Sequence, residues 1–325
     1  MKLCVISADT VKEIISMEDA VNILEKAFLE YSRDCVSMPH RINMELSSGS
    51  TITMPAYING SETGAVKIVS VFDNNHKIGL PTVNALINVI DSNSGMPLAV
   101  MDGTEITAIR TGAAGGLATK LISRENSSIC ALIGAGKQAI YQLRGVMSSR
   151  RIKELRIFDK SIDALEKFKE QAQKEFPELN IVLSKNTAEA LYKVDIITCT
   201  TNSKEPVFSP KEVSKGTHIN GIGSYTRKMK EVPIEKMQDI KVYADGRQAV
   251  MAEAGEIIQA IKEGVLKEEN IIEIGELIER KDLGRTNDSQ ITFFKSVGLA
   301  IQDTAIANYI YQKVIKLNKA QFIEL

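Results

Sequence analysis

The chain has 325 residues, of which 44% are hydrophobic and 25% are charged, a composition typical of a globular protein with roughly two domains. Its 40 basic and 41 acidic residues leave a formal net charge of −1, which excludes a general electrostatic attraction to nucleic acid or to an anionic membrane surface. The four cysteines and three histidines are scattered, so neither a disulfide framework nor a metal site is expected. Without a signal peptide or an apolar run of membrane-spanning length, the chain is predicted to be cytoplasmic.

The first third of the sequence is predicted to mix helix with antiparallel strands. Apolar residues recur at helical spacing over residues 18–33, and Ser16 is the expected N-cap. Strand-like runs follow at 52–56, 65–72 and 83–91, separated by turn signals such as Asn59-Gly60. These short connections favour antiparallel pairing.

From about residue 111 the pattern changes to alternating helices and strands, which is typical of a parallel sheet with helices on both faces. A small-residue helix is predicted over 111–121 and a long apolar helix over 297–315. Strands are predicted at 129–133, 154–159, 181–183, 194–200, 218–222 and 241–244. The change of pattern places a domain boundary near residue 118.

The strongest local motif joins the strand at 129–133 to a helix through Gly-Ala-Gly-Lys-Gln-Ala at 134–139. Gly134 permits a tight turn, Gly136 lets the backbone approach a pyrophosphate, and Ala139 allows close packing of helix on strand. The free N–H groups at the helix N-terminus, beginning at Lys137 and Gln138, favour phosphate binding. The motif therefore predicts a Rossmann-type dinucleotide site.

The next predicted strand ends at Asp159, 20 residues after Ala139. A carboxylate at this position accepts hydrogen bonds from the adenosine ribose and repels a 2′-phosphate, which favours NAD over NADP, although Arg156 or Lys160 could compensate. Further strand ends supply Thr200 and, together, Gly221 and Ile222. Ligands bind at the carboxyl ends of parallel strands, so these residues are candidates for the same crevice.

Three basic residues of the first third stand in unusual surroundings. Lys67 alternates with apolar residues along its strand, so it is either a solvent-facing lysine, the reading that the pattern alone favours, or a catalytic lysine with a lowered pKa. Arg110 lies among small and apolar residues and suits either a structural ion pair or a carboxylate or phosphate ligand. Arg41 follows a rigid Pro-His turn and by itself is a weak candidate.

Taken in order, these segments resemble the family of ornithine cyclodeaminase and μ-crystallin over nearly the whole chain. The resemblance rests on the segments at 38–41, 64–67, 79–82, 108–114, 133–139, 218–225 and 294–298. It implies an α/β fold with an NAD-binding Rossmann domain (118–302) and an α+β substrate-binding and dimerisation domain (1–117 with 303–325). It also implies a homodimer that acts on a small amino or imino acid.

The resemblance also implies roles for individual residues. Arg41, Lys67 and Arg110 would hold the substrate beside Val297, with Lys67 and Arg110 as the catalytic pair. The dinucleotide would be contacted by Thr82, Arg110, Gly134, Gly136, Lys137, Gln138, Asp159, Thr200, Gly221, Ile222 and Ser296.

One position departs from the cyclodeaminase pattern. Where those enzymes carry a catalytic aspartate after the Asn-x-x-Gly strand, this chain has Tyr225, and a phenol is a poor general base near neutral pH. The sequence therefore predicts an NAD-dependent oxidoreductase that reduces a 2-imino acid. Two alternatives remain: an ornithine cyclodeaminase with catalytic NAD, and a non-catalytic dinucleotide-dependent binding protein.

Overall fold

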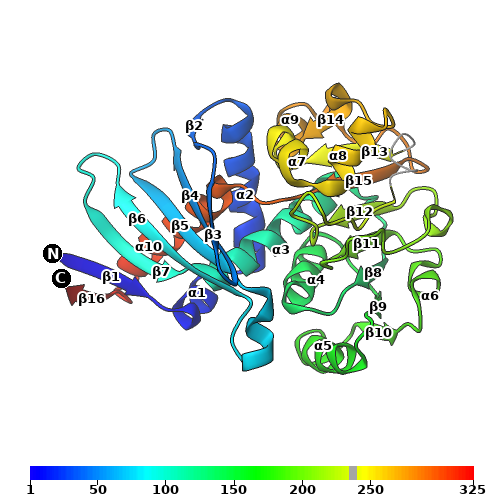
Figure 1. Cartoon of the computed structure of the whole chain (residues 1–325), viewed down its shortest axis with the longest axis horizontal. Helices are drawn as coiled ribbons and strands as arrows, with labels where there is room; N and C mark the ends of the chain where they lie inside the picture. The colour runs from blue at the N-terminus through cyan, green and yellow to red at the C-terminus, as the bar shows by residue number, and fades with distance from the viewer. Residues whose placement is uncertain (234–239) are drawn as a thin grey trace. The chain divides into compact units, whose positions relative to one another are not determined.

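The computed structural model describes residues 1–233 and 240–325 (Figure 1). It divides into two compact units: unit 1 comprises Met1–Arg110 with Leu299–Leu325, and unit 2 comprises Thr111–Gly298. Helix α3 (Gly103–Ile122) carries the chain from one unit to the other. The division therefore falls inside a helix, earlier than residue 118, and the chain returns to unit 1 just before its last long helix.

Unit 1 is a sheet with helices. Its elements are β1 (Lys2–Ile6), α1 (Ala8–Ile14), α2 (Met17–Ser32), β2 (Val36–Ser37), β3 (Ile42–Leu46), β4 (Gly49–Ile58), β5 (Thr63–Val71), η1 (Asp73–Ile78), β6 (Val83–Asp91), β7 (Pro97–Asp102), α10 (Ala300–Lys316) and β16 (Gln321–Glu324). The strand order is β16-β1-β7-β6-β5-β4-β2, with β3 paired to β4. All neighbours are antiparallel except β1 and β7.

Helix α10 covers one face of this sheet and contacts β4, β5, β6 and α2 (Figure 1). Alternation along β5 turns Ala65, Lys67 and Val69 inward, where they are buried, and leaves Ile68 exposed. The apolar residues of β5 and α10 thus remove each other from water. Ser16 and Asp19 form a reciprocal capping box that starts α2 one residue before its predicted range.

The strands predicted at 52–56, 65–72 and 83–91 are confirmed as the antiparallel strands β4, β5 and β6. The helix predicted over 297–315 begins later, at Ala300, because Gly298 has a φ of +85° and interrupts the helical backbone. Strands β1, β2, β3, β7 and β16 were not predicted; β3 and β16 are exposed edge segments that carry no buried face.

Unit 2 contains a wholly parallel sheet in the order β10-β9-β8-β11-β12-β15-β13-β14. Its strands are β8 (Ile129–Ile133), β9 (Glu154–Phe158), β10 (Asn180–Leu183), β11 (Ile196–Cys199), β12 (His218–Gly221), β13 (Ile240–Ala244), β14 (Ile271–Glu273) and β15 (Ile291–Lys295). Its further helices are α4 (Lys137–Ser149), α5 (Ile162–Glu175), α6 (Thr187–Leu191), α7 (Arg247–Glu253), α8 (Gly255–Lys262) and α9 (Ile274–Glu279), with short η turns at Pro210–Glu212, Glu268–Asn270 and Lys281–Leu283.

This strand order confirms the Rossmann-type α/β fold. The chain leaves β8 toward β9 and β10 on one side and later returns to β11 and β12 on the other. The order of strands therefore reverses between β8 and β11, which is the switch point where open α/β sheets bind ligands at their carboxyl ends.

Helix α3 is longer than the predicted range 111–121. It begins at Gly103 directly after β7, and the carboxylate of Asp102 accepts a hydrogen bond from the backbone N–H of Glu105, which supplies the N-terminal signal that the sequence pattern did not reveal. Its small residues serve close packing on α4: a Cβ at Gly112 would lie 2.3 Å from the carbonyl oxygen of Tyr141. Glycine therefore brings the two helices into backbone contact.

Cys4, Cys35, Cys130 and Cys199 are free thiols, and all but Cys35 are buried. Across the described residues, none of the helices combines the length and the apolar character that crossing a membrane requires.

Candidate active site

The glycine loop between β8 and α4 is built for close approach of a ligand. Gly134 has a φ of +101°, and a Cβ there would lie 2.9 Å from the hydroxyl of Thr200. That hydroxyl in turn donates to the carbonyl oxygen of Gly134 over 2.9 Å. Gly136 caps α4 without a side chain, is exposed, and has open space where a Cβ would stand. The first N–H groups of α4, from the exposed Lys137 onward, are thus accessible to an anion.

Asp159 follows β9 and braces this loop. Its Oδ2 accepts from the backbone N–H of Ala135 over 2.7 Å, and its Oδ1 accepts from that of Ser161 over 2.8 Å. Each carboxylate oxygen keeps a second acceptor position, which suits ribose hydroxyls. Arg156 is held elsewhere, with its Nε 2.6 Å from Glu154, so it does not neutralise Asp159.

The loop residues fit a dinucleotide on structural grounds. The side-chain oxygen of Gln138, at the start of α4, is buried and receives no hydrogen bond from the described residues. An orphaned acceptor beside open N–H groups is explained when a ligand supplies the missing donor. This half of the candidate site consists of residues whose contacts with a cofactor remain predictions: Gly134, Gly136, Lys137, Gln138, Asp159 and Thr200.

The carboxyl end of β15 reveals a residue that sequence reasoning missed. The fully buried Oδ2 of Asp245 accepts hydrogen bonds from the Ser296 hydroxyl and from the backbone N–H groups of Val297 and Gly298, at 2.7 to 3.0 Å. Ser296 and Val297, which the resemblance assigns to cofactor and substrate, are thus positioned by one carboxylate. Its position after the strand at 241–244 was the available signal.

The end of β12 combines packing with hydrogen bonding. A Cβ at Gly221 would lie 2.7 Å from the ring of Phe293, so glycine is needed there for packing. The backbone N–H of the buried Ile222 donates to the carbonyl of Cys199. A cofactor contact of Gly221 and Ile222 remains a prediction.

Tyr225 lies in the loop after β12 and is 36% exposed. The nearest following acid, Glu231, does not replace the missing aspartate. Burial raises the pKa of Glu231, but both of its oxygens accept hydrogen bonds, from Thr201 and from the backbone N–H groups of Gly223 and Ser224. This carboxylate therefore has no acceptor position left for a substrate proton.

In unit 1, Lys67 is buried rather than solvent-facing, so the reading that the pattern favoured is wrong. Its ammonium lies 2.6 Å from Oδ2 of Asp303 on α10, and the two side chains are 1% and 2% exposed. The alternation of side chains along β5 directs Lys67 toward α10, where the carboxylate of Asp303 lies. Asp303 was not singled out from the sequence, although it is an acidic residue on the buried face of an apolar helix.

Arg110 joins the same carboxylate. Its Nε lies 3.3 Å from Oδ1 of Asp303, and its terminal NH1 donates to the side-chain oxygen of Gln302 over 2.8 Å. The structural ion pair foreseen as one alternative for Arg110 is therefore present. Two buried cations thus share the carboxylate of Asp303. We call Lys67, Arg110 and Asp303 the cation cluster.

Burial lowers the pKa of Lys67 to about 8, the positive charges of Arg110 and Arg41 act in the same direction, and Asp303 opposes them. Arg41 is half-buried and precedes β3. A lysine poised near neutral pH can bind an anion when charged and exchange a proton with a substrate. Thr82 stands before β6, half-buried, and its carbonyl accepts from the N–H of Phe72; its cofactor contact remains a prediction.

Comparison with known proteins shows the family of this chain. The model of the ornithine cyclodeaminase/mu-crystallin family matches residues 1–318. A Delta(1)-pyrroline-2-carboxylate reductase of Bacillus cereus is 33% identical over 326 residues, covering 99% of this chain and all of the relative.

Two solved structures are similar over the whole chain. The Delta(1)-pyrroline-2-carboxylate reductase of Thermococcus litoralis, in complex with NADH and L-proline, has 37% identity and a TM-score of 0.95, covering 99% of this chain and 100% of that one. An archaeal alanine dehydrogenase dimer with bound NAD has 34% identity and a TM-score of 0.93, with both chains fully covered. The family model over residues 1–318 and the relatives of more than 30% identity show that this chain belongs to the ornithine cyclodeaminase/mu-crystallin family.

Proposed function

We propose that the protein is an NAD-dependent oxidoreductase that reduces a small 2-imino acid to the amino acid. The observation that carries this proposal is the cation cluster: Lys67 and Arg110 are buried and share the single carboxylate of Asp303. With Lys67 protonated, the three charges sum to +1. An excess positive charge away from water is costly unless an anionic group joins it, and the carboxylate of an imino acid is such a group.

The cofactor proposed is NAD. The loop at Gly134–Gly136 and the α4 N-terminus would hold its pyrophosphate, and Asp159 its adenosine ribose. The carboxylate of Asp159 disfavours the 2′-phosphate of NADP, since Arg156 is engaged with Glu154. When bound, NADH supplies the hydride that reduces the C=N bond.

The chain's own residues then bind and orient the substrate. Arg110 presents a planar guanidinium whose fork geometry matches a carboxylate, and Asp303 and Gln302 hold it in place. Lys67, charged below pH 8, adds a second contact and transfers a proton to the substrate nitrogen as that atom becomes an amine. Fixing the carboxylate at two points restricts the orientation of the carbon to be reduced.

The relatives support this substrate class. The reductases from Bacillus and Thermococcus act on a cyclic imino acid, and the archaeal relative is an alanine dehydrogenase. The first reaction reduces a C=N bond beside a carboxylate, and the second does so when it runs toward alanine. Cyclodeamination of ornithine has weaker support, because Tyr225 stands in place of the acid and the oxygens of Glu231 are saturated by hydrogen bonds.

The experiment is an NADH-oxidation assay with pyrroline-2-carboxylate and with pyruvate plus ammonia. We expect turnover with at least one of them, and a loss of at least 100-fold in kcat/KM in Lys67→Met, an order of magnitude in line with the removal of a catalytic proton-transfer group. NADH binding in unit 2 serves as the control for an intact fold. Tight NADH binding without turnover of any imino acid would favour the binding-protein alternative, whereas ammonia release from ornithine would favour the cyclodeaminase.

We also propose that residues 1–117 with 303–325, which largely coincide with unit 1, are the substrate-binding and dimerisation domain, and that residues 118–302 bind NAD. The face of the sheet opposite α10 supports dimerisation. Ile42, Thr53, Ile68 and Leu86 stand side by side across β3, β4, β5 and β6, and the three apolar members are 67%, 42% and 55% exposed.

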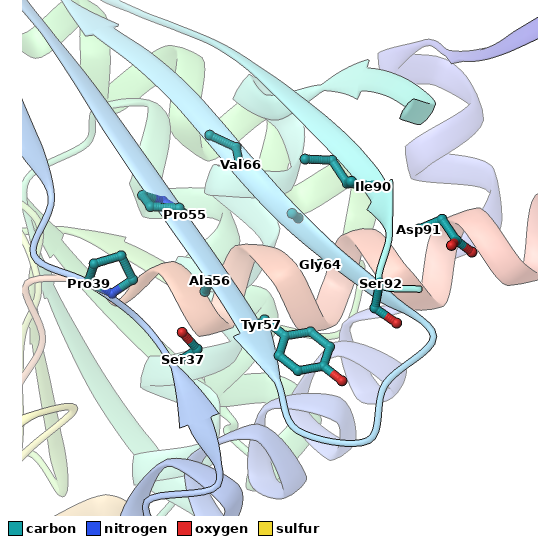
Figure 2. A pocket seen from close by; sticks show the side chains of 11 residues that line it. Ser37, Pro39, Pro55, Ala56, Tyr57, Gly64, Val66, Ile90, Asp91 and Ser92 are labelled. Atoms are coloured by element: carbon teal, nitrogen blue, oxygen red, sulfur yellow. The ribbon is translucent and has the colours of Figure 1, made fainter. Parts of the chain in front are cut away.

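The same sheet bears a hollow of about 450 Å³ that is lined from β4, β5 and β6, with α10 passing behind the strands (Figure 2). Apolar side chains that line up over several strands without cover are typical of a protein–protein interface. The archaeal relative is a dimer, and a second copy of this chain is the partner proposed.

A further inference from the structure

Three fully buried charged side chains of unit 2 come together near the carboxyl ends of its strands, and the proposed function uses none of them. Glu231, Glu256 and Lys295 are each 0% exposed; they are hereafter the buried triad. They come from the loop after β12, from α8 and from the last residue of β15. Burying three such groups carries a large desolvation cost, so their retention calls for a reason.

Glu231 is held in its ionised form by geometry. Its Oε1 accepts from the N–H and the hydroxyl of Thr201, and its Oε2 accepts from the N–H groups of Gly223 and Ser224, at 2.6 to 2.9 Å. These four donors occupy the acceptor positions of a carboxylate, and a protonated acid would meet only donors. Glu231 thereby links the loops that follow β11 and β12.

The other two members form an ion pair. The ammonium of Lys295 lies 3.1 Å from Oε1 of Glu256, whose Oε2 accepts from the hydroxyl of Ser224 over 2.5 Å. With one cation and two anions, the buried triad carries a net charge of −1. Asp245, buried at the end of the neighbouring β13, adds a further negative charge.

The strands that carry the buried triad indicate which half of a bound dinucleotide it lies near. Its members cluster at the carboxyl ends of β11, β12 and β15, while Asp159, the ribose ligand proposed above, follows β9 on the other side of β8. A dinucleotide bound across the switch point places its two halves on these two sides. The buried triad therefore lies on the nicotinamide side.

We propose that the buried triad lowers the electrostatic potential beneath the nicotinamide and thereby favours binding of NAD⁺ over NADH. The oxidised ring carries a positive charge and the reduced ring is neutral, so a net negative charge in a water-poor interior stabilises the oxidised form selectively. The inference rests on the proposed function, because it requires the dinucleotide site.

The fully buried thiol of Cys199, at the end of β11, lies within the field of the same three charges. Burial raises its pKa well above the ordinary value, Glu231 and Glu256 raise it further, and Lys295 opposes them. Two anions and one cation thus act on a group at the carboxyl end of β11.

The test compares the dissociation constants of NAD⁺ and NADH by calorimetry, without substrate. Glu256→Gln changes the charge of the buried triad from −1 to 0, and we expect Kd(NAD⁺)/Kd(NADH) to rise by about fivefold, the effect of one partly screened charge. The double variant Lys295→Met/Glu256→Gln restores a net charge of −1, and its ratio should return to within about twofold of the wild type. Glu231→Gln removes the same charge at another position and should raise the ratio too, so the test survives if one variant does not fold.

An unchanged Kd(NAD⁺)/Kd(NADH) in every folded single variant overturns the inference. A rise in the double variant as large as that in Glu256→Gln also overturns it, because the effect would then come from packing damage at that position and not from the charge. Failure of the wild type to bind either dinucleotide contradicts the proposed function instead.

Discussion

The ammonium of Lys67 and the carboxylate of Asp303 lie 2.6 Å apart in the interior of unit 1, although 236 positions separate the two residues in the sequence. The same carboxylate approaches Arg110. The last long helix of the chain thus supplies the carboxylate that holds both cations proposed to bind the substrate.

Replacing Asp303 by Asn should therefore damage stability and substrate binding together. The variant leaves two buried cations without a counter-charge, and we expect the free energy of unfolding to fall by about 3 kcal/mol. The pKa of Lys67 should fall further, so the KM for the imino acid should rise at least tenfold at pH 8. Urea denaturation and steady-state kinetics measure both quantities; Glu166→Gln, an exposed acid on α5, is the control. Near-wild-type values for both would contradict the role assigned to Asp303.

The pH profile of kcat/KM should report Lys67. Its pKa is lowered to about 8, chiefly by burial, so the ammonium is charged below pH 8 and neutral above it. Since a charged lysine binds the carboxylate and donates the proton, kcat/KM for imine reduction should be level below pH 8 and fall tenfold per unit above it. In Lys67→Arg, whose guanidinium stays charged, the fall should shift upward by at least one pH unit. An unshifted fall in that variant would assign the titration to another group.

Cofactor choice should depend on Asp159. Asp159→Asn removes the negative charge but keeps one side-chain oxygen, which can accept from one of the two backbone N–H groups that the carboxylate now binds. We expect NADH to bind less tightly, and the preference for NADH over NADPH to fall by about tenfold, because the repulsion of the 2′-phosphate is lost. Arg156→Gln is the matched control, since that guanidinium is engaged with Glu154. A preference for NADH that survives in Asp159→Asn would show that another residue sets it.

The two halves of the site differ in how far the sequence could predict them. The segment from Gly134 to Asp159 is local: strand, glycine loop, helix and acid follow one another, so spacing alone indicated a dinucleotide fold, and the parallel sheet confirmed that fold. Lys67 could not be resolved in the same way. A lysine on an alternating strand is stable either in water or beside a carboxylate, and only the distant Asp303 decides between the two.

The buried carboxylates escaped prediction for a related reason. Asp245 and Glu231 look like ordinary loop acids, because the groups that they bind are backbone N–H groups of other strand ends. Almost every residue type carries a backbone N–H, so the residue types in a sequence do not indicate where such a donor binds a carboxylate. The predicted start of helix α3 was too late for the same reason. The helix begins where the carboxylate of Asp102 accepts a hydrogen bond from a backbone N–H.

The uncovered sheet face should be the dimer interface. Ile68→Lys with Leu86→Lys places two charges per chain in a surface that the homodimer would remove from water, at a cost of several kcal/mol for the pair of subunits. Light scattering during gel filtration should give twice 35.7 kDa for the wild type and the single-chain mass for the variant. Ile162→Lys, at a position 69% exposed on α5, should remain dimeric. A monomeric wild type would refute the proposed homodimer directly.

Acid sensitivity should trace to His218, which is fully buried in β12 between Thr292 and Asn220. Burial lowers its pKa to about 3, and the charge of Arg285 acts in the same direction. The unfolded chain therefore takes up this proton near pH 6.5 and the folded chain does so only near pH 3. The contribution of His218 to stability is fully present above pH 6.5 and is lost as the pH falls, by about 2 kcal/mol at pH 5.

In His218→Gln, the free energy of unfolding should fall by about 2 kcal/mol less between pH 7 and pH 5 than in the wild type. His76→Gln, in an exposed turn, should keep the wild-type slope. An equal slope in His218→Gln would mean that the histidine is already protonated in the fold, with Asn220 and Thr292 both accepting from its ring.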